Sequence, residues 1–208
     1  MDTGTALRER LIDVGVELVL AEGTGSVGLR EIARRAGVSH GAPRRYFPTH
    51  RELLSAIARR GFEELGARSA EATAGIAAPR EQLAALARVY VTYALERRGM
   101  FELMFRHDLL DSEQQGATPG GAPLREATLP MFERVVELVA RCGETAEVPA
   151  AVTAAALWAN LHGVAQLWSW GSLQLALGDG DDGTPVRPGG PDRLIAAVLD
   201  AHLGPVIP

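Results

Sequence analysis

The sequence LREIARRAGVSHGAPRRYF, residues 29–47, has the proportions of two short helices joined by a tight turn. Gly37 suits a turn conformation that a side chain would hinder, and Ser39 is placed to cap a second helix, residues 40–47. Pro43 then falls in the first turn of that helix, where its missing N–H costs least. The first helix has a buried side of small and apolar residues, Ile32, Ala33 and Ala36. This layout is typical of a helix-turn-helix.

The charge of this stretch is opposite to that of the whole chain. The chain has a net charge of −5, and all 21 of its Lys and Arg positions are arginine. Residues 27–51 nevertheless hold a single acid, Glu31, among six arginines: Arg30, Arg34, Arg35, Arg44, Arg45 and Arg51. A basic patch on an acidic protein favours a DNA-binding surface. The alternative is a solvated arginine face on an ordinary helical bundle.

The rest of the chain predicts further helices and no strand. Gly23 is suited to end a helix that precedes the motif, at about residues 5–21. Thr49-His50-Arg51-Glu52 has the capping-box form that starts a long helix after the motif. Apolar residues at helical spacing predict an all-α fold of nine helices, at about residues 5–21, 28–36, 40–47, 50–72, 77–98, 100–107, 123–142, 149–177 and 191–203. Loops are expected at 111–123 and 178–190.

The motif resembles the DNA-binding domain of the TetR family of bacterial transcriptional regulators. The family pattern is close to REIAxxAGVSxGxxYxxF followed by Pro, a basic residue and Leu, and this chain has REIARRAGVSHGAPRRYFPTHRELL. The resemblance covers residues 7–57, and it departs from the pattern at Arg44, where Tyr is common, and at His50, where Lys is frequent. It implies a nine-helix TetR-like architecture, with a helix-turn-helix domain over 1–50 and a ligand-sensing and dimerisation domain over 51–208.

The resemblance also implies roles for individual residues. Arg30 is a candidate base reader, because arginine offers two donors to guanine. Residues expected against base edges are Gly41, Ala42 and Arg44, and those expected against phosphates are Arg45, Tyr46 and His50. Ser39 and His40, at the start of the second helix, complete the expected DNA contacts. The implied partners are a palindromic operator in double-stranded DNA, a second copy of the chain and a small-molecule effector.

The C-terminal half contains Trp158, His162 and Gly163 in the Trp-x-x-x-His-Gly spacing that resembles one TetR subgroup. Aromatic and methionine side chains around a few polar tips are typical of a small-molecule pocket, and they describe a normal core equally well. The candidate pocket residues are Tyr90, Phe101, Met104, Phe105, Met131, Trp158 and His162. For His162 two interpretations stay open, a hydrogen-bonded core histidine and a ligand contact.

The predicted helix at 149–177 has two apolar stripes about 100° apart, and a helix that is apolar on two faces is buried twice. We expect the stripe with Trp158 and His162 to face the core and the other to face a second copy, as in the four-helix bundle that the resemblance implies. The expected dimer interface consists of Leu157, Leu161, Val164, Trp168, Leu175, Leu194, Val198, Leu199 and His202.

Other classes of function lack support in the sequence. It has no phosphate-binding glycine loop, nucleophile elbow, zinc-protease motif or cysteine pair. We therefore expect that the protein is not an enzyme and that it has neither a cofactor nor a metal site. No apolar run is long enough for a membrane span, and the single cysteine, Cys142, is in keeping with a reducing cytoplasm. We expect a cytoplasmic repressor that a small apolar ligand releases from its operator. The alternatives are an activator or a ligand-independent DNA binder of the same type, and more remotely a small helical-bundle enzyme.

Overall fold

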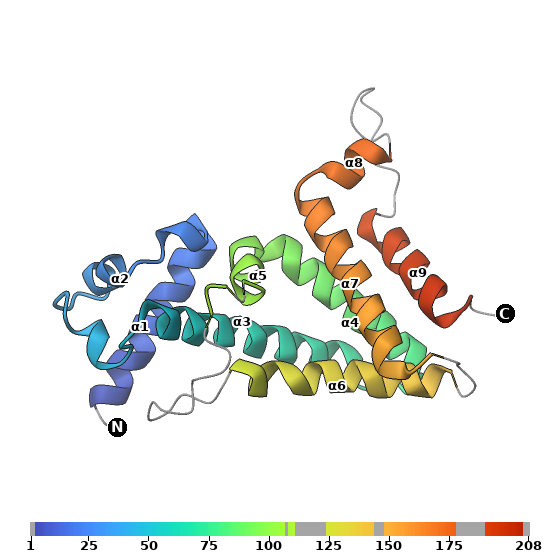
Figure 1. Ribbon diagram of the computed structural model, residues 1–208, viewed down its shortest axis with the longest axis horizontal. Coiled ribbons are helices and arrows are strands. Elements are labelled where there is room, and N and C mark those ends of the chain that lie inside the picture. The colour runs from blue at the N-terminus through green and yellow to red at the C-terminus, as the bar shows by residue number, and fades with distance from the viewer. Residues whose placement is uncertain (1–2, 107, 111–123, 144–147, 178–189, 206–208) are drawn as a thin grey trace. The chain divides into compact units, whose positions relative to one another are not determined.

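The computed structural model describes residues 3–106, 108–110, 124–143, 148–177 and 190–205. These ranges contain helices and turns and no strand, which confirms the predicted all-α fold. Their nine α-helices (Figure 1) are α1 Thr3–Glu22, α2 Leu29–Arg35, α3 His50–Thr73, α4 Pro79–Glu96, α5 Arg98–Met104, α6 Leu124–Cys142, α7 Ala150–Ser169, α8 Ser172–Ala176 and α9 Gly190–Leu203. None of these helices combines the length and the apolar content that a membrane span requires.

The chain packs as two compact units. The N-terminal unit comprises Met1–Glu64 and Arg97–Leu129, and the C-terminal unit comprises Leu65–Glu96 and Pro130–Pro208. Helix α3 therefore begins in the first unit and ends in the second. This division by packing differs from the expected functional division at residue 50, because α5 packs against α1 and so belongs with the helix-turn-helix.

Three helices of the N-terminal unit approach one another so closely that side chains are excluded at glycines. A Cβ on Gly15 of α1 would lie 2.4 Å from Cδ1 of Ile57 in α3. A Cβ on Gly61 of α3 would lie 2.6 Å from a methionine sulfur of α5. One on Gly99 of α5 would lie 2.4 Å from the carbonyl oxygen of Val19 in α1. Glycine at these positions is what allows α1, α3 and α5 to form one packed body.

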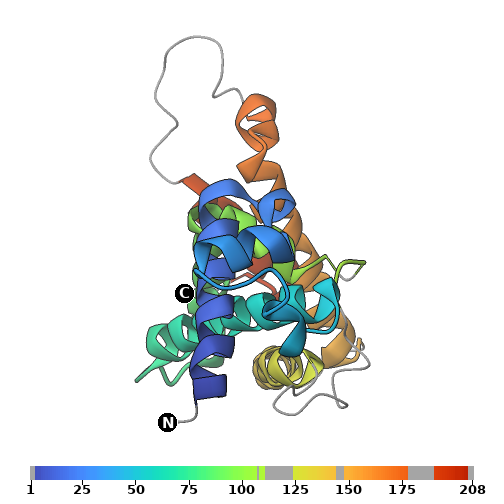
Figure 2. The ribbon, with the colours of Figure 1, turned by 90° about the vertical axis from the view of Figure 1, so that its left-hand side faces the viewer.

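Two local signals in the motif are confirmed by the backbone geometry. The Glu52 N–H donates to Thr49 Oγ1 over 3.1 Å, and the Thr49 hydroxyl lies 3.2 Å from the Glu52 carboxylate, so the predicted capping pair starts α3. Gly23 and Gly37 have φ values of 80° and 68°, in the left-handed region that glycine adopts without a steric penalty. The end of α1 and the turn after α2 therefore form as predicted (Figure 2).

The second half of the motif is not the α-helix predicted over residues 40–47. Only η2, Pro43–Arg45, is helical there, and it is a single 3₁₀ turn. Pro43 has no N–H, so it cannot donate to the Ser39 carbonyl as an α-helix requires, and Ala42 N–H donates to that carbonyl instead, over 2.9 Å. The predicted side-chain cap from Ser39 is also wrong, because η2 starts after Ala42 without a side-chain cap.

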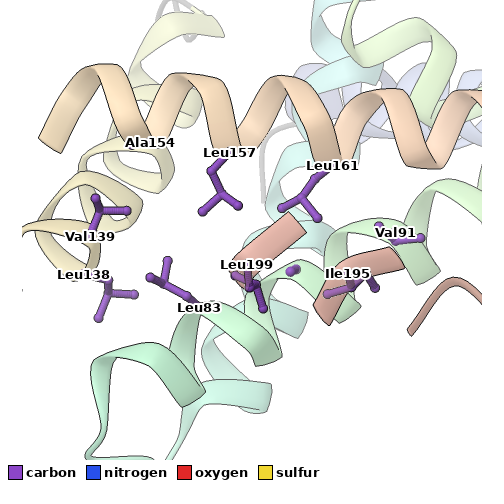
Figure 3. Close-up of a cluster of buried hydrophobic side chains, with 10 residues drawn as sticks. Leu83, Val91, Leu138, Val139, Ala154, Leu157, Leu161, Ile195 and Leu199 are labelled. Carbon is purple, nitrogen blue, oxygen red and sulfur yellow. The ribbon is translucent and has the colours of Figure 1, made fainter. Parts of the chain in front are cut away.

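The core of the C-terminal unit is formed by α4, α6, α7 and α9 (Figure 3). Its buried side chains are Leu83, Ala87, Val91, Leu138, Val139, Ala154, Leu157, Leu161, Ile195 and Leu199. Two ion pairs join α4 to α9, Arg80 to Asp200 over 2.5 Å and Arg88 to Asp192 over 3.7 Å. The order of these partners is reversed between the two helices, so α9 runs antiparallel to α4.

The predicted helix at 149–177 is divided by Gly171, whose φ of 77° ends α7 before α8 begins. The faces of α7 also differ from the prediction. Leu157 and Leu161, expected at the dimer interface, are buried in the chain's own core, as is Leu199 of α9. Trp158, expected to face the core, is 40% exposed. Both stripes are apolar, so the choice between them depends on contacts with α4 and α9 that the helix's own pattern does not contain.

The exposed face of α7 is a third stripe, which spacings of three and four residues place on one side of the helix. Its exposed apolar and small residues are Val152, Ala156, Ala159 and Leu167, with Trp170 at the C-cap. Of the other residues expected at the dimer interface, Leu175 on α8 is exposed, and the half-buried ones are Val164, Trp168, Leu194, Val198 and His202.

Gly99→Ala should lower the free energy of unfolding by about 1–3 kcal/mol, because the obstacle to the new methyl group is a backbone carbonyl that has no other rotamer. The matched control is Gly66→Ala, inside α3, where a Cβ meets no atom within 4 Å. It should raise stability by about 0.5–1 kcal/mol, as alanine does in a helix interior. Urea unfolding of the two variants measures the difference, and equal effects would contradict the close approach of α5 and α1.

Candidate nucleic-acid interface and a hydrogen-bonded aromatic group

Helix α2 buries one side and turns its arginines outward. Ile32 and Ala33 are fully buried, and Ala36 follows them after the helix end. The other side exposes Arg30, Arg34 and Arg35. The apolar positions predicted from the sequence therefore set the orientation of α2, and its basic side chains lie at the surface.

The six arginines of residues 27–51 differ in their partners. Arg34 and Arg35 are hydrogen-bonded to Glu31, and Arg51 donates from Nη2 to the carbonyl of Asp108 over 2.6 Å. The other three, Arg30, Arg44 and Arg45, are exposed and have no acidic partner within the described part of the chain. The last two lie on the η2 turn. Three guanidinium groups at the motif are thus available to an outside anion.

The other predicted DNA contacts lie around these arginines. Exposed residues of this set are Ser39, His40 and Gly41, and partly buried ones are Ala42 and Tyr46. His50, expected on a phosphate, donates from Nε2 to the carbonyl of Val27. This contact joins the start of α3 to the segment before α2, so one of the two ring nitrogens is already used within the protein.

The predicted pocket residues fall into two groups, one in each unit. In the N-terminal unit Phe101 and Met104 are fully buried. The Phe105 ring makes edge contacts with Phe101 and with Phe62 of α3, with centroids 4.9 Å and 5.7 Å apart. These residues pack in the contact between α5 and α3.

In the C-terminal unit three of the predicted pocket residues form a hydrogen-bonded group. Trp158 Nε1–H donates to the Tyr90 oxygen over 2.9 Å, and the Tyr90 oxygen lies 2.8 Å from His162 Nδ1. Trp158 and His162 are one turn apart on α7, and Tyr90 comes from α4. The direction of the Tyr90–His162 bond depends on the imidazole tautomer, and the hydroxyl is the donor to Nδ1 when the ring proton is on Nε2.

Burial keeps this group neutral. It raises the pKa of the Tyr90 hydroxyl, more strongly than the Trp158 hydrogen bond lowers it, and it lowers the pKa of His162. The Phe132 ring makes an edge contact with Trp158, with centroids 6.3 Å apart, and the neighbouring Met131 is half-buried. The structure therefore brings uncharged polar atoms and apolar rings together. A hydrogen bond to His162 is present, as the core interpretation requires.

Sequence reasoning missed the acidic partners of the α2 arginines. Glu31 stands three and four residues before Arg34 and Arg35, and these are the spacings at which side chains on one helix face meet. That signal was sufficient to predict both pairs. The contact of Arg35 with Glu22 of α1 had no local signal, because it depends on how α1 and α2 pack. Among the described residues, no three His, Cys, Asp or Glu side chains are grouped as a metal site would need.

Comparisons with known proteins agree with this arrangement. Residues 11–57 match the family described as "Bacterial regulatory proteins, tetR family", and residues 83–183 match "Tetracyclin repressor-like, C-terminal domain". The first match contains the motif, and the second contains Tyr90, Trp158 and His162. The chain belongs to the TetR family of transcriptional regulators.

Individual relatives are similar over different lengths. The HTH-type transcriptional regulator BetI of Rhizobium meliloti (strain 1021) is 37% identical over 82 residues, which span 39% of this chain and only 40% of BetI. A solved protein of unknown function from Rhodococcus sp. RHA1 is 29% identical, with a TM-score of 0.70 over 95% of this chain and 93% of that one. The TetR-family protein SCO1917 from Streptomyces coelicolor A3 is 26% identical, with a TM-score of 0.57 over 95% and 98%.

The lowered pKa of His162 predicts a pH dependence of stability. The unfolded imidazole takes up a proton as the pH falls through about 6.5, while the buried one resists protonation. The unfolded state then binds more protons, so the free energy of unfolding should fall below that pH, until the folded imidazole is protonated as well. His162→Gln removes this contribution, and its urea-unfolding profile between about pH 7.5 and 5 should decline less than the wild-type profile. Parallel profiles would show that burial does not perturb His162.

Proposed function

We propose that this chain is a sequence-specific DNA-binding regulator, a repressor that leaves a palindromic operator when a small apolar ligand binds. The observation that carries the DNA-binding part is the set of three exposed arginines, Arg30, Arg44 and Arg45, without acidic partners at the helix-turn-helix. Guanidinium groups placed in this way neutralise phosphates and read guanine edges.

The 3₁₀ turn of η2 influences how its arginines meet DNA. Successive side chains of a 3₁₀ turn diverge by about 120°, against about 100° in an α-helix. Arg44 and Arg45 therefore point to different sides of the turn. This divergence supports the roles assigned to them, with Arg44 on base edges in the major groove and Arg45 on the phosphates beside it. Arg30 lies at the start of α2 and is the second candidate base reader.

A dimer is part of the proposal, because a palindromic operator needs two readers related by a two-fold axis. The exposed stripe of α7, with Val152, Ala156, Ala159 and Leu167, replaces the predicted leucine stripe as the proposed contact. Small residues there allow two α7 helices to approach closely. Exposed alanines on α9, Ala196, Ala197 and Ala201, are suited to the same contact. The two half-sites should then lie about 34–36 Å apart or slightly more.

The proposed sensing site is the group of Tyr90, Trp158 and His162 with the neighbouring Phe132. Its polar atoms are uncharged and its rings are apolar, which favours a ligand without a net charge. RolR, a solved protein of this fold at 21% identity, is described in complex with the ligand resorcinol. A ligand releases DNA only if it binds the DNA-incompetent state more tightly, and a coupling of about 1–3 kcal/mol gives a 5–150-fold loss of operator affinity.

Arg45→Ala should weaken binding to all DNA sequences alike, since a phosphate contact has no base preference. A dimer loses two contacts, so the slope of log K against log salt concentration should flatten by about 1.8, whereas a monomer would lose about 0.9. The control is Arg98→Ala on α5, which removes the same charge from a residue that pairs with Glu102. Filter binding to a duplex at several salt concentrations measures the slope. An unchanged slope for Arg45→Ala would remove this residue from the DNA interface.

Trp158→Ala should weaken ligand response and leave DNA binding intact. The operator is first selected from genomic fragments that the protein retains, and a compound that releases the wild type is found by gel shift. With that compound, the variant should need a concentration at least fivefold higher for release, while ligand-free operator affinity stays within a few-fold. Release at the wild-type concentration would show that Trp158 only packs the core.

A further inference from the structure

The surface around the motif contains a second, restrained set of positive charges. Arg34 and Arg35 lie at the end of α2, and both are bound to carboxylates of the protein itself. In a helix-turn-helix the first helix crosses the DNA backbone, so arginines on its exposed side lie near phosphates. These two arginines therefore differ from Arg30, Arg44 and Arg45 in their partners and not in the kind of surface they occupy.

The carboxylate of Glu31 holds both guanidinium groups at once. Arg34 donates from Nε to Oε2 over 2.8 Å and from Nη2 to Oε1 over 2.5 Å, a two-bond contact that matches the planar fork of arginine. Arg35 donates from Nε to the same Oε1 over 2.8 Å, and its Nη2 is bound to Glu22 of α1. Hydrogen bonds from Arg34, and to a smaller degree from Arg35, lower the pKa of Glu31 to about 2. The carboxylate is therefore charged at every pH at which DNA binding is measured.

Stability alone does not account for this cluster. Ion pairs at the surface add little to folding, because water already solvates the separated charges. The Arg34 side chain is 65% exposed even while it is paired. For DNA binding, each arginine that reaches a phosphate steepens the salt dependence by about 0.9. Affinity of this kind has no sequence preference, so it acts on random DNA and on the operator alike.

We infer that Glu31, assisted by Glu22, withholds Arg34 and Arg35 from DNA phosphates and thereby limits the sequence-independent part of DNA binding. Glu31 then limits non-specific affinity without contacting the DNA itself. The inference rests on the proposed DNA-binding function. It predicts that the wild-type protein binds random DNA more weakly than its count of surface arginines would indicate.

The test compares Glu31→Gln with Glu102→Gln in the full-length chain, on a random-sequence duplex over a range of salt concentrations. Glutamine keeps the shape of either side chain, and each variant removes one negative charge, so the net charge changes equally in both. Glu102 pairs with Arg98 on α5, over 3.2 Å at the same i,i+4 spacing, and so serves as the matched control. Glu31→Gln should steepen the salt slope by about 0.9–1.8 per subunit, and Glu102→Gln should leave it unchanged.

A second substitution identifies the arginines. Arg34→Ala added to Glu31→Gln should remove about 0.9 of the gained slope per subunit, while Arg34→Ala in the wild-type background should remove less. Equal slopes for Glu31→Gln and Glu102→Gln would overturn the inference, as would a gain that Arg34→Ala leaves intact. Failure of the proposed function has a different signature, because wild-type protein would then not bind the duplex at low salt. Thermal unfolding of each variant checks that α2 keeps its fold.

Discussion

Backbone approach at three glycines is the constraint on which the N-terminal unit depends. Gly15, Gly61 and Gly99 stand where α1, α3 and α5 are too close for a Cβ, and at Gly99 the neighbour is a backbone carbonyl. At Gly99 no rotamer change can relieve the contact, so a displacement there passes from one helix to the other. Helix α5 is remote from the motif in sequence, yet these contacts place both in one packed unit. A shift of α5 must therefore be shared by α1, which supports α2.

The missing N–H of Pro43 also affects the local structure of the motif surface. Pro43 cannot donate to the Ser39 carbonyl, and the chain forms a 3₁₀ turn at residues 43–45 with exposed arginines on it. Glu31 acts on the neighbouring helix by binding the arginines that follow it. The positive surface of the motif is therefore smaller than its composition indicates. Arg30, Arg44 and Arg45 are exposed without acidic partners, whereas Glu31 and Glu22 restrain Arg34 and Arg35.

Features with local causes could be predicted from the sequence. The capping pair Thr49 and Glu52 and the left-handed Gly37 depend only on residues close in the chain, and both form as expected. Exposed arginines at the motif also follow from the charge pattern. The core face of α7 could not be derived, because that helix is apolar on several sides and only α4 and α9 select Leu157 and Leu161. For the same reason the candidate pocket residues divide between two units, since no local pattern indicates which rings share a core.

The distribution of indole side chains has an optical consequence. All three tryptophans lie between residues 158 and 170, on α7 and its C-cap, so intrinsic tryptophan fluorescence originates in the C-terminal unit alone. Trp158 is hydrogen-bonded to Tyr90, whereas Trp170 is 60% exposed, so the two emit from different surroundings. The helix-turn-helix has no tryptophan of its own. A change in tryptophan emission on DNA binding would therefore report a change of surroundings in the C-terminal unit, so the three indoles are a built-in reporter of communication between the two units.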